Sequence, residues 1–140
     1  MKNILLLFLF YSTIAFSQNS VVGQWKSIDD LTGESKSVVE IYKVGTKYFG
    51  KIVKVLREKD KNALCEKCKG NNYKKPVLGM IIIKDLVQDE NNFKDGEILD
   101  PENGKTYDCK IWVDKNNNNL LNVRGYIGFL FRTQKWIRVK

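Results

Sequence analysis

The chain has 140 residues, a formal net charge of +8, 43% hydrophobic residues and no histidine. The lack of histidine excludes serine and cysteine hydrolases of the histidine-assisted type and removes the most common metal ligand in proteins. Much of the basic excess is spread singly along the chain, which argues against a nucleic-acid-binding protein and favours a solvated basic surface. The alternative is attraction to anionic envelope polymers or lipid headgroups.

The first 17 residues have the layout of a secretory signal peptide. Lys2 supplies a positive charge, residues 4–10 are an unbroken apolar run, and Ala15 and Ser17 are small residues before the expected cut. The apolar stretch is too short to span a bilayer comfortably. We therefore expect cleavage after Ser17, export to the periplasm or beyond, and a mature chain, residues 18–140, that forms one domain without a transmembrane segment.

Short runs rich in Val, Ile, Tyr, Phe and Trp follow, separated by turn residues, and this pattern predicts an all-β domain. We expect strands over Val22–Ile28, Ser37–Lys43, Tyr48–Leu56, Met80–Val87, Gly96–Asp100, Thr106–Val113, Leu120–Tyr126 and Phe129–Val139. Apolar and polar side chains alternate most clearly in the run from Thr106 to Val113, so one face looks inward and the other outward. Since most connections are short, the simplest topology is a single antiparallel up-and-down barrel of about eight strands.

One connection, residues 57–79, is too long for a simple turn and contains Cys65 and Cys68. Closely spaced cysteines in an exported protein favour a local structural disulfide. A redox-active pair, half of a zinc site, or a bond from one of them to Cys109 are the alternatives. Cys109 lies on the apolar face of its strand and is most simply a buried free thiol. We expect neither a bound metal nor a cofactor.

Gly23 and Trp25 open the first strand, and Arg138 lies on the last one. This arrangement indicates a barrel whose end is closed by the indole, with the guanidinium stacked over it in a cation–π contact. The alternative is an ordinary core tryptophan and an unrelated surface arginine.

A second set of residues is the candidate ligand site: Asp100, Tyr107, Arg124, Tyr126 and Arg132. Arg124 and Tyr126 share one face of a strand, and Arg132 follows the next turn. Arginine and tyrosine together in a barrel mouth would bind a carboxylate or a phosphate. The alternative is structural, with Arg124 paired to Asp100 or Asp108 and Tyr126 half-buried.

Several stretches resemble the bacterial family known as domain of unknown function 2147. The most specific are Asp100-Pro101-Glu102-Asn103-Gly104-Lys105-Thr106-Tyr107 and Val123-Arg124-Gly125-Tyr126-Ile127-Gly128, and the resemblance covers nearly the whole mature chain. It implies an exported barrel of the lipocalin-like or fatty-acid-binding-like sort, and no established activity. The paired cysteines and the Ser-Gln junction resemble the Bacteroidetes branch, which implies a Gram-negative envelope.

The favoured function is binding of a small apolar or amphipathic ligand, an anionic one included, inside the barrel. An alternative is an envelope interaction protein that contacts a protein or polysaccharide through its surface. A third is an enzyme that works without histidine at the barrel mouth, but arginines there would lower a neighbouring carboxylate pKa and so oppose a general acid. We expect a monomer or a weak homodimer.

Overall fold

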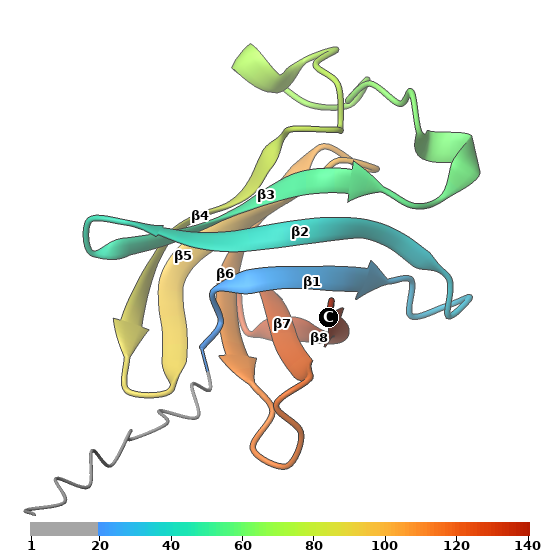
Figure 1. The fold of residues 1–140 in the computed structure, drawn as a ribbon. Coiled ribbons are helices and arrows are strands. Elements are labelled where there is room, and N and C mark those ends of the chain that lie inside the picture. The colour runs from blue at the N-terminus through green and yellow to red at the C-terminus, as the bar shows by residue number, and fades with distance from the viewer. Residues whose placement is uncertain (1–19) are drawn as a thin grey trace, which may run out of the picture.

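The computed structural model describes residues 20–140, which form a closed barrel of eight strands, each antiparallel to its neighbours (Figure 1). The expected signal peptide lies outside the described residues. The strands are β1 Gly23–Ile28, β2 Ser35–Val44, β3 Lys47–Val55, β4 Ile81–Asp89, β5 Asn92–Asp100, β6 Lys105–Val113, β7 Leu120–Ile127 and β8 Leu130–Arg138. Two short 3-10 helices, η1 Glu58–Asp60 and η2 Gly70–Asn72, lie between β3 and β4.

The predicted up-and-down topology is confirmed. Sequence neighbours pair throughout, and β1 closes the circle by pairing with β8 at Trp25 with Arg138 and Lys26 with Ile137. In such a barrel alternate connections lie at the same end. We call one end the mouth, formed by connections 29–34, 56–80, 101–104 and 128–129. The other end, which carries the chain termini and the turns after β2, β4 and β6, is the base.

Inward-facing side chains form one continuous core. Trp25, Val39, Ile41, Ile111 and Leu121 are all fully buried. They alternate along their strands with more exposed residues, as expected for a sheet with one face turned to the interior.

Strand β5 differs from the prediction because it begins at Asn92 rather than Gly96. The backbone of Asp95 is left-handed, with φ of 62°, and the register with β6 shifts between Phe93 and Gly96, which interrupts the alternation. Gly96 is required here because a Cβ atom would lie 2.3 Å from the carbonyl oxygen of Lys84. The sequence places a glycine at this bulge, where we expected a strand to start.

The long connection between β3 and β4 projects from the barrel and has an internal structure of its own (Figure 1). Cys65 and Cys68 form a disulfide, both are buried, and Cys109 is a buried free thiol. Leu64 pairs with Pro76 in an isolated antiparallel bridge inside the connection. Gly104, with φ of +72°, allows the connection to lie close against the mouth. A Cβ atom at this position would lie 2.0 Å from the carbonyl oxygen of Lys67.

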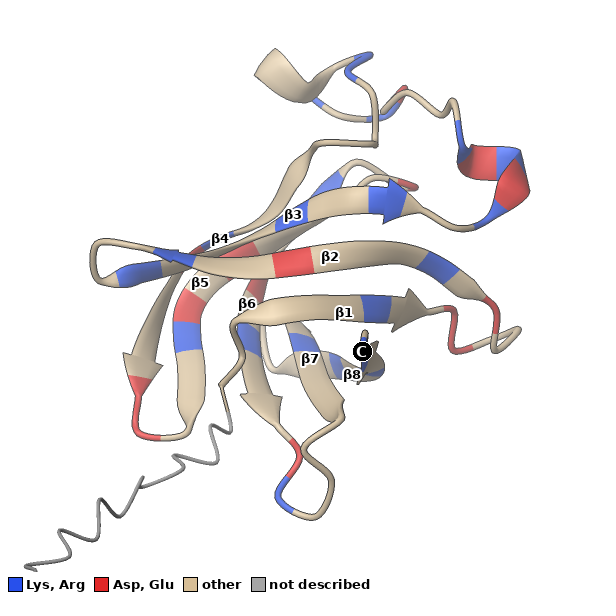
Figure 2. Ribbon diagram, viewed as in Figure 1, with Lys and Arg blue, Asp and Glu red and all other residues tan. Residues whose placement is uncertain are grey.

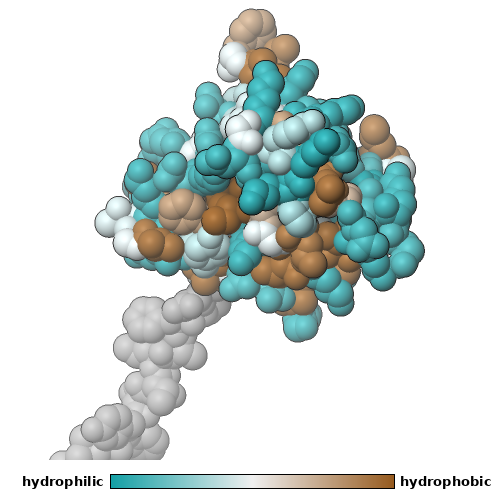
Figure 3. Space-filling view, turned by 90° about the horizontal axis from the view of Figure 1, so that it is seen from above, coloured by the Kyte–Doolittle hydropathy of each residue, from teal (hydrophilic) through white to brown (hydrophobic). Residues whose placement is uncertain are grey.

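Basic residues are distributed over most strands and over the long connection rather than gathered on one face (Figure 2). Seen from the side of the long connection, the surface is mainly hydrophilic with separate hydrophobic areas between (Figure 3). Within residues 20–140, no helix has the length and apolar character needed to cross a membrane.

Candidate functional site

The base of the barrel is covered by Trp25 and Arg138. The guanidinium carbon of Arg138 lies 4.1 Å from the centroid of the indole ring, a cation–π contact. Its Nη2 donates to the carbonyl of Ser20 at 3.1 Å and its Nε to that of Asn118 at 3.1 Å. The indole Nε1 donates to the Val21 carbonyl at 2.8 Å, and Gly23 adjoins the guanidinium. Trp25 and Arg138 therefore close the base of the barrel, and a ligand would enter the interior through the mouth.

A cavity of about 700 Å³ lies between the barrel interior and the mouth. Its walls are mostly apolar side chains that point inward from the strands, such as Ile52, Val55, Ile82, Ile98 and Val123. Trp136, which is 2% exposed, also lines it. The side chains of this barrel therefore leave room in its interior.

Gly125 contributes to this space from β7. A Cβ atom there would meet only ordinary contacts, 3.5 Å from Cβ of Tyr107 and 3.9 Å from Cγ2 of Ile98. Close packing therefore does not require glycine at this position. Because Gly125 has no side chain, the space beside the Tyr107 ring is part of the cavity.

Polar side chains also line the cavity, the charged ones at its mouth end, and several of them already have partners. The hydroxyls of Ser27 and Ser37 lie 2.8 Å apart. The indole Nε1 of Trp136 donates to Gln134 at 3.2 Å. Nearer the mouth, the amide of Asn103 donates to the Tyr107 hydroxyl at 2.9 Å. An apolar wall with a few oriented polar groups is the usual composition of a small-molecule site.

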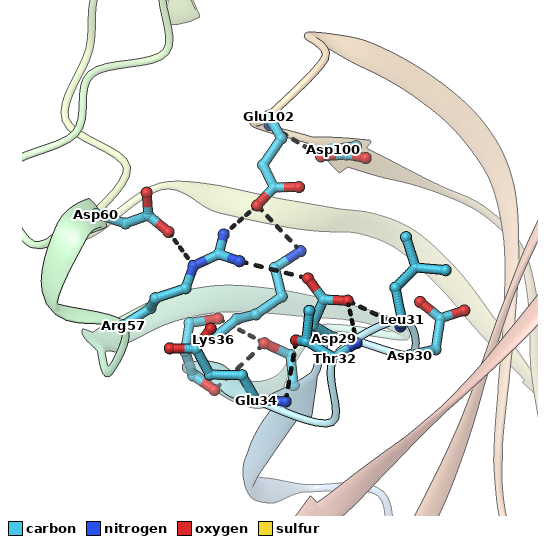
Figure 4. Close-up of polar contacts among 12 residues, drawn as sticks. Asp29, Asp30, Leu31, Thr32, Glu34, Lys36, Arg57, Asp60, Asp100 and Glu102 are labelled. Atoms are coloured by element: carbon cyan, nitrogen blue, oxygen red, sulfur yellow. Dashed lines mark hydrogen bonds and ion pairs between the residues drawn. The ribbon is translucent and has the colours of Figure 1, made fainter.

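Arg57 organises the polar part of the mouth (Figure 4). Its side chain is 8% exposed and forms ion pairs with Asp29, at 3.4 Å from Nη1 to Oδ2, and with Asp60 and Glu102. Lys36 reaches the same Glu102 carboxylate at 3.5 Å. One guanidinium thus joins three connections that are far apart in the sequence.

These contacts shift the ionisation of the groups involved. Burial alone would lower the pKa of Arg57, but its hydrogen bonds to Asp60 and Glu102 outweigh that effect and raise it. The pKa of Asp29 is held below its usual value, first by the hydrogen bond from the Leu31 amide and further by the Thr32 amide and the nearby cations. Both partners therefore remain charged at neutral pH.

Arg132 forms the second ion pair of the mouth. Its Nε donates to Oδ2 of Asp30 at 2.8 Å, and its Nη2 contacts the other oxygen of the same carboxylate. This hydrogen-bonded pair is the main cause of the lowered Asp30 pKa. It links the β1–β2 connection to β8 across the rim, with both side chains partly exposed.

The structure brings together only part of the predicted ligand site. Asp100, Tyr107 and Arg132 line the cavity. Arg124 and Tyr126 lie on the outer face of β7, so their predicted placement inside the barrel mouth is wrong. The cause is strand alternation, since Val123, Gly125 and Ile127 are the β7 residues that line the cavity.

Outside the barrel, the contacts of Arg124 are structural, with aromatic rings and a hydroxyl rather than with Asp100 or Asp108. Its guanidinium carbon lies 4.9 Å from the Trp112 ring centroid and 4.2 Å from that of Phe131. Its Nε donates to the hydroxyl of Thr133 at 2.8 Å. Tyr126 also packs beside Phe131, with ring centroids 6.0 Å apart.

Sequence reasoning missed Arg57, Lys36 and Glu102, whose roles depend on contacts between distant segments. Arg57 is 28 residues from Asp29 and 45 from Glu102. The available signal was a single arginine at the end of a strand, in a chain where nearly all other cations are lysines.

Comparison with known proteins gives the family and the fold. The family model described as "Uncharacterized protein conserved in bacteria (DUF2147)" matches residues 23–138, and the chain belongs to this family. A solved structure described as "Protein HP1028 from the human pathogen Helicobacter pylori belongs to the lipocalin family" is similar, with a TM-score of 0.74 and 18% identity. The match covers 86% of this chain and 84% of that one, and it shows a lipocalin-like fold. No curated protein matches.

Proposed function

We propose that this member of the DUF2147 family is an exported binding protein that holds one small apolar or amphipathic molecule inside its barrel. The observation that carries the proposal is the apolar cavity of about 700 Å³ that reaches the mouth. Sites for small molecules have volumes of roughly 300–1,000 Å³, so the space suits one ligand.

The charges at the mouth favour a ligand whose polar end is neutral. Among the cations that line the cavity, Arg57, Arg132 and Lys36 already pair with carboxylates. Lys67, which forms no ion pair within residues 20–140, lies exposed on the long connection. A ligand carboxylate or phosphate would have to displace Glu102 or Asp30, or lie beside them as a like charge. We therefore propose an uncharged polar end directed at the Tyr107 and Asn103 side chains.

Two fluorescent probes that share an aromatic body test this preference. N-phenyl-1-naphthylamine is neutral, and 1-anilinonaphthalene-8-sulfonate adds a sulfonate. We expect saturable binding of the neutral probe with one site per barrel, and weaker binding of the sulfonate. Native mass spectrometry of protein purified from its own host should show a co-purified molecule of low mass. Failure of both probes to saturate, with no co-purified molecule, would refute ligand binding.

The location of the bound ligand is tested by placing a larger side chain in the cavity. Gly125→Leu places a side chain in the cavity, and we expect it to weaken binding of the neutral probe by roughly tenfold or more. Gly125→Ala adds one carbon with ordinary contacts and should have a small effect. Arg124→Gln is the matched control on the outer face of the same strand and should leave the affinity unchanged. Equal affinities for Gly125→Leu and the unmodified protein, at preserved thermal stability, would place the ligand elsewhere.

Export is the second part of the proposal. It is supported by the leader-like residues 1–17 and by the Cys65–Cys68 disulfide, a bond typical of oxidising compartments. The intact mass of protein recovered from the host envelope should correspond to a chain that begins at Gln18. A chain that retains Met1 and is recovered with the reducing cytoplasm would contradict export.

A further inference from the structure

The most exposed large apolar side chains all lie at the mouth. Among the described residues, four exceed 60% exposure: Phe129 at 92%, Leu31 at 88%, Leu130 at 64% and Ile127 at 63%. They belong to two neighbouring features of the rim, the β1–β2 connection and the β7–β8 hairpin tip. The ion pair between Arg132 and Asp30 joins these two features. We call these four residues the apolar rim.

The fold does not require apolar side chains at these turns. In the β1–β2 connection the carboxylate of Asp29 accepts hydrogen bonds from the amides of Leu31 and Thr32, which fixes the turn irrespective of the Leu31 side chain. In the hairpin, Gly128 supplies the positive φ of 58° that the turn needs, and Phe129 is left nearly fully exposed. Turn tips normally carry polar residues, so two nearly fully exposed apolar side chains on neighbouring turns mark this part of the rim as a candidate contact surface.

The opposite side of the mouth is basic. The connection from residue 57 to 79 has seven Lys or Arg against three Asp or Glu. Lys67, Lys69, Lys74 and Lys75 are exposed, and within residues 20–140 none of them forms an ion pair. Residues of this connection and of the apolar rim line the same cavity, so both flank one opening.

We propose that the mouth docks on the surface of a bilayer that contains anionic phospholipid. In this orientation Leu31 and Phe129 enter the boundary between headgroups and acyl chains, and the loop lysines meet the headgroups. A bilayer accepts apolar side chains that project singly from separate turns, whereas a protein partner would need a matching pocket for each. Docking would also place the cavity opening against the lipid. Such docking involves only the outer rim and the long connection, whichever ligand the barrel holds.

Co-sedimentation with vesicles tests the proposal, using protein as its host processes it and an intact mass to establish the N-terminus of every sample. One set of vesicles contains equal parts of phosphatidylglycerol and phosphatidylcholine, and the other contains phosphatidylcholine only. We expect binding to the mixed vesicles, weakened by added salt, and much weaker binding to the neutral ones.

Paired variants locate the contact. Leu31→Ser with Phe129→Ser should lower the partition coefficient by roughly tenfold or more. Val44→Ser with Val87→Ser removes exposed valines at the base and should change it less than about twofold. Likewise Lys69→Glu with Lys74→Glu should weaken binding far more than Lys43→Glu with Lys115→Glu, which makes the same change in net charge at the base.

Three results would overturn the proposal. The first is no sedimentation with mixed vesicles. The second is an equal loss for the mouth and base variants, which would mean that binding depends on overall charge or on a retained leader. The third is a dimer in analytical ultracentrifugation that Leu31→Ser with Phe129→Ser converts to a monomer without changing vesicle binding, which would make the apolar rim an interface between two copies.

Discussion

Replacing Arg57 by Met should destabilise the barrel more than any other single change to a charged residue at the mouth. The guanidinium is 8% exposed, and its loss leaves Asp29, Asp60 and Glu102 without their shared cation. Breaking a fully buried ion pair costs about 3–5 kcal/mol. Here the carboxylates reach water to increasing degrees, at 18%, 32% and 52% exposure, so part of that penalty is relieved by solvation. We expect a loss of about 2–3 kcal/mol in the free energy of unfolding.

Urea unfolding followed by tryptophan fluorescence measures this loss, and Arg132→Met provides the matched control. That arginine also pairs with a carboxylate at the mouth, but it is 61% exposed and its partner Asp30 is 39% exposed. Exposed pairs contribute about 0–1 kcal/mol, so its removal should be barely detectable. Equal effects of the two variants, or a loss below about 0.5 kcal/mol for Arg57→Met, would refute burial as the reason for the difference.

The pH dependence of the free energy of unfolding in acid is an independent test of the same cluster. The folded-state pKa of Asp29 is depressed below its ordinary 3.8, so the folded state binds fewer protons than the unfolded state as that carboxyl titrates. The contribution of Asp29 is therefore complete above the ordinary pKa and is lost as the pH falls through the folded-state value. Stability should decline below about pH 4, and Arg57→Met should make this decline only slightly shallower, because the Leu31 amide is the main cause of the depressed Asp29 pKa and Arg57 a minor one.

Three further experiments have defined expected outcomes. Burial raises the pKa of Cys109 to about 12, so the folded protein at pH 8 should react with iodoacetamide roughly a thousandfold more slowly than the urea-unfolded chain. Gly104→Ala should cost roughly 2 kcal/mol or more and expose residues 57–79 to limited proteolysis, since its Cβ would collide with the Lys67 carbonyl. Arg138→Met should cost about 2 kcal/mol in urea unfolding through loss of the indole contact and two hydrogen bonds, with Arg138→Lys only partly restoring it.

The architecture was predictable because each strand carries its own local signal. The alternation from Thr106 to Val113 defines β6 over nearly its full length, and short turns between successive runs lead directly to up-and-down pairing. The start of β5 was not predictable in the same way. Its bulge depends on the backbone of β4 approaching Gly96, a contact made only once two strands have paired.

The site was harder to predict because alternation separates two faces without saying which face is inside. On β7 the outer face carries Arg124 and Tyr126, while the inner face carries Gly125, whose contribution is the absence of a side chain. The chemically reactive side chains of β7 thus lie on its outer face, which is why they drew the prediction away from the cavity. Phe131 and Trp112 shield Arg124 there, which is why a charged residue outside the barrel is half-buried.

The four arginines of this chain differ from its lysines in how they are used. Against twenty lysines, each arginine has a specific partner set: carboxylates for Arg57 and Arg132, aromatic rings for Arg124 and Arg138. A planar guanidinium can hold several acceptors in fixed directions or stack on a ring, whereas an ammonium group is a compact, strongly hydrated charge. Most lysines therefore supply diffuse positive charge, which the proposed bilayer contact uses, although Lys36 joins the ion pairs of the mouth. The arginines stabilise the mouth, the base and the outer face of β7. Exchanging the two at a position such as Arg57 should consequently disturb the fold even though the net charge is unchanged.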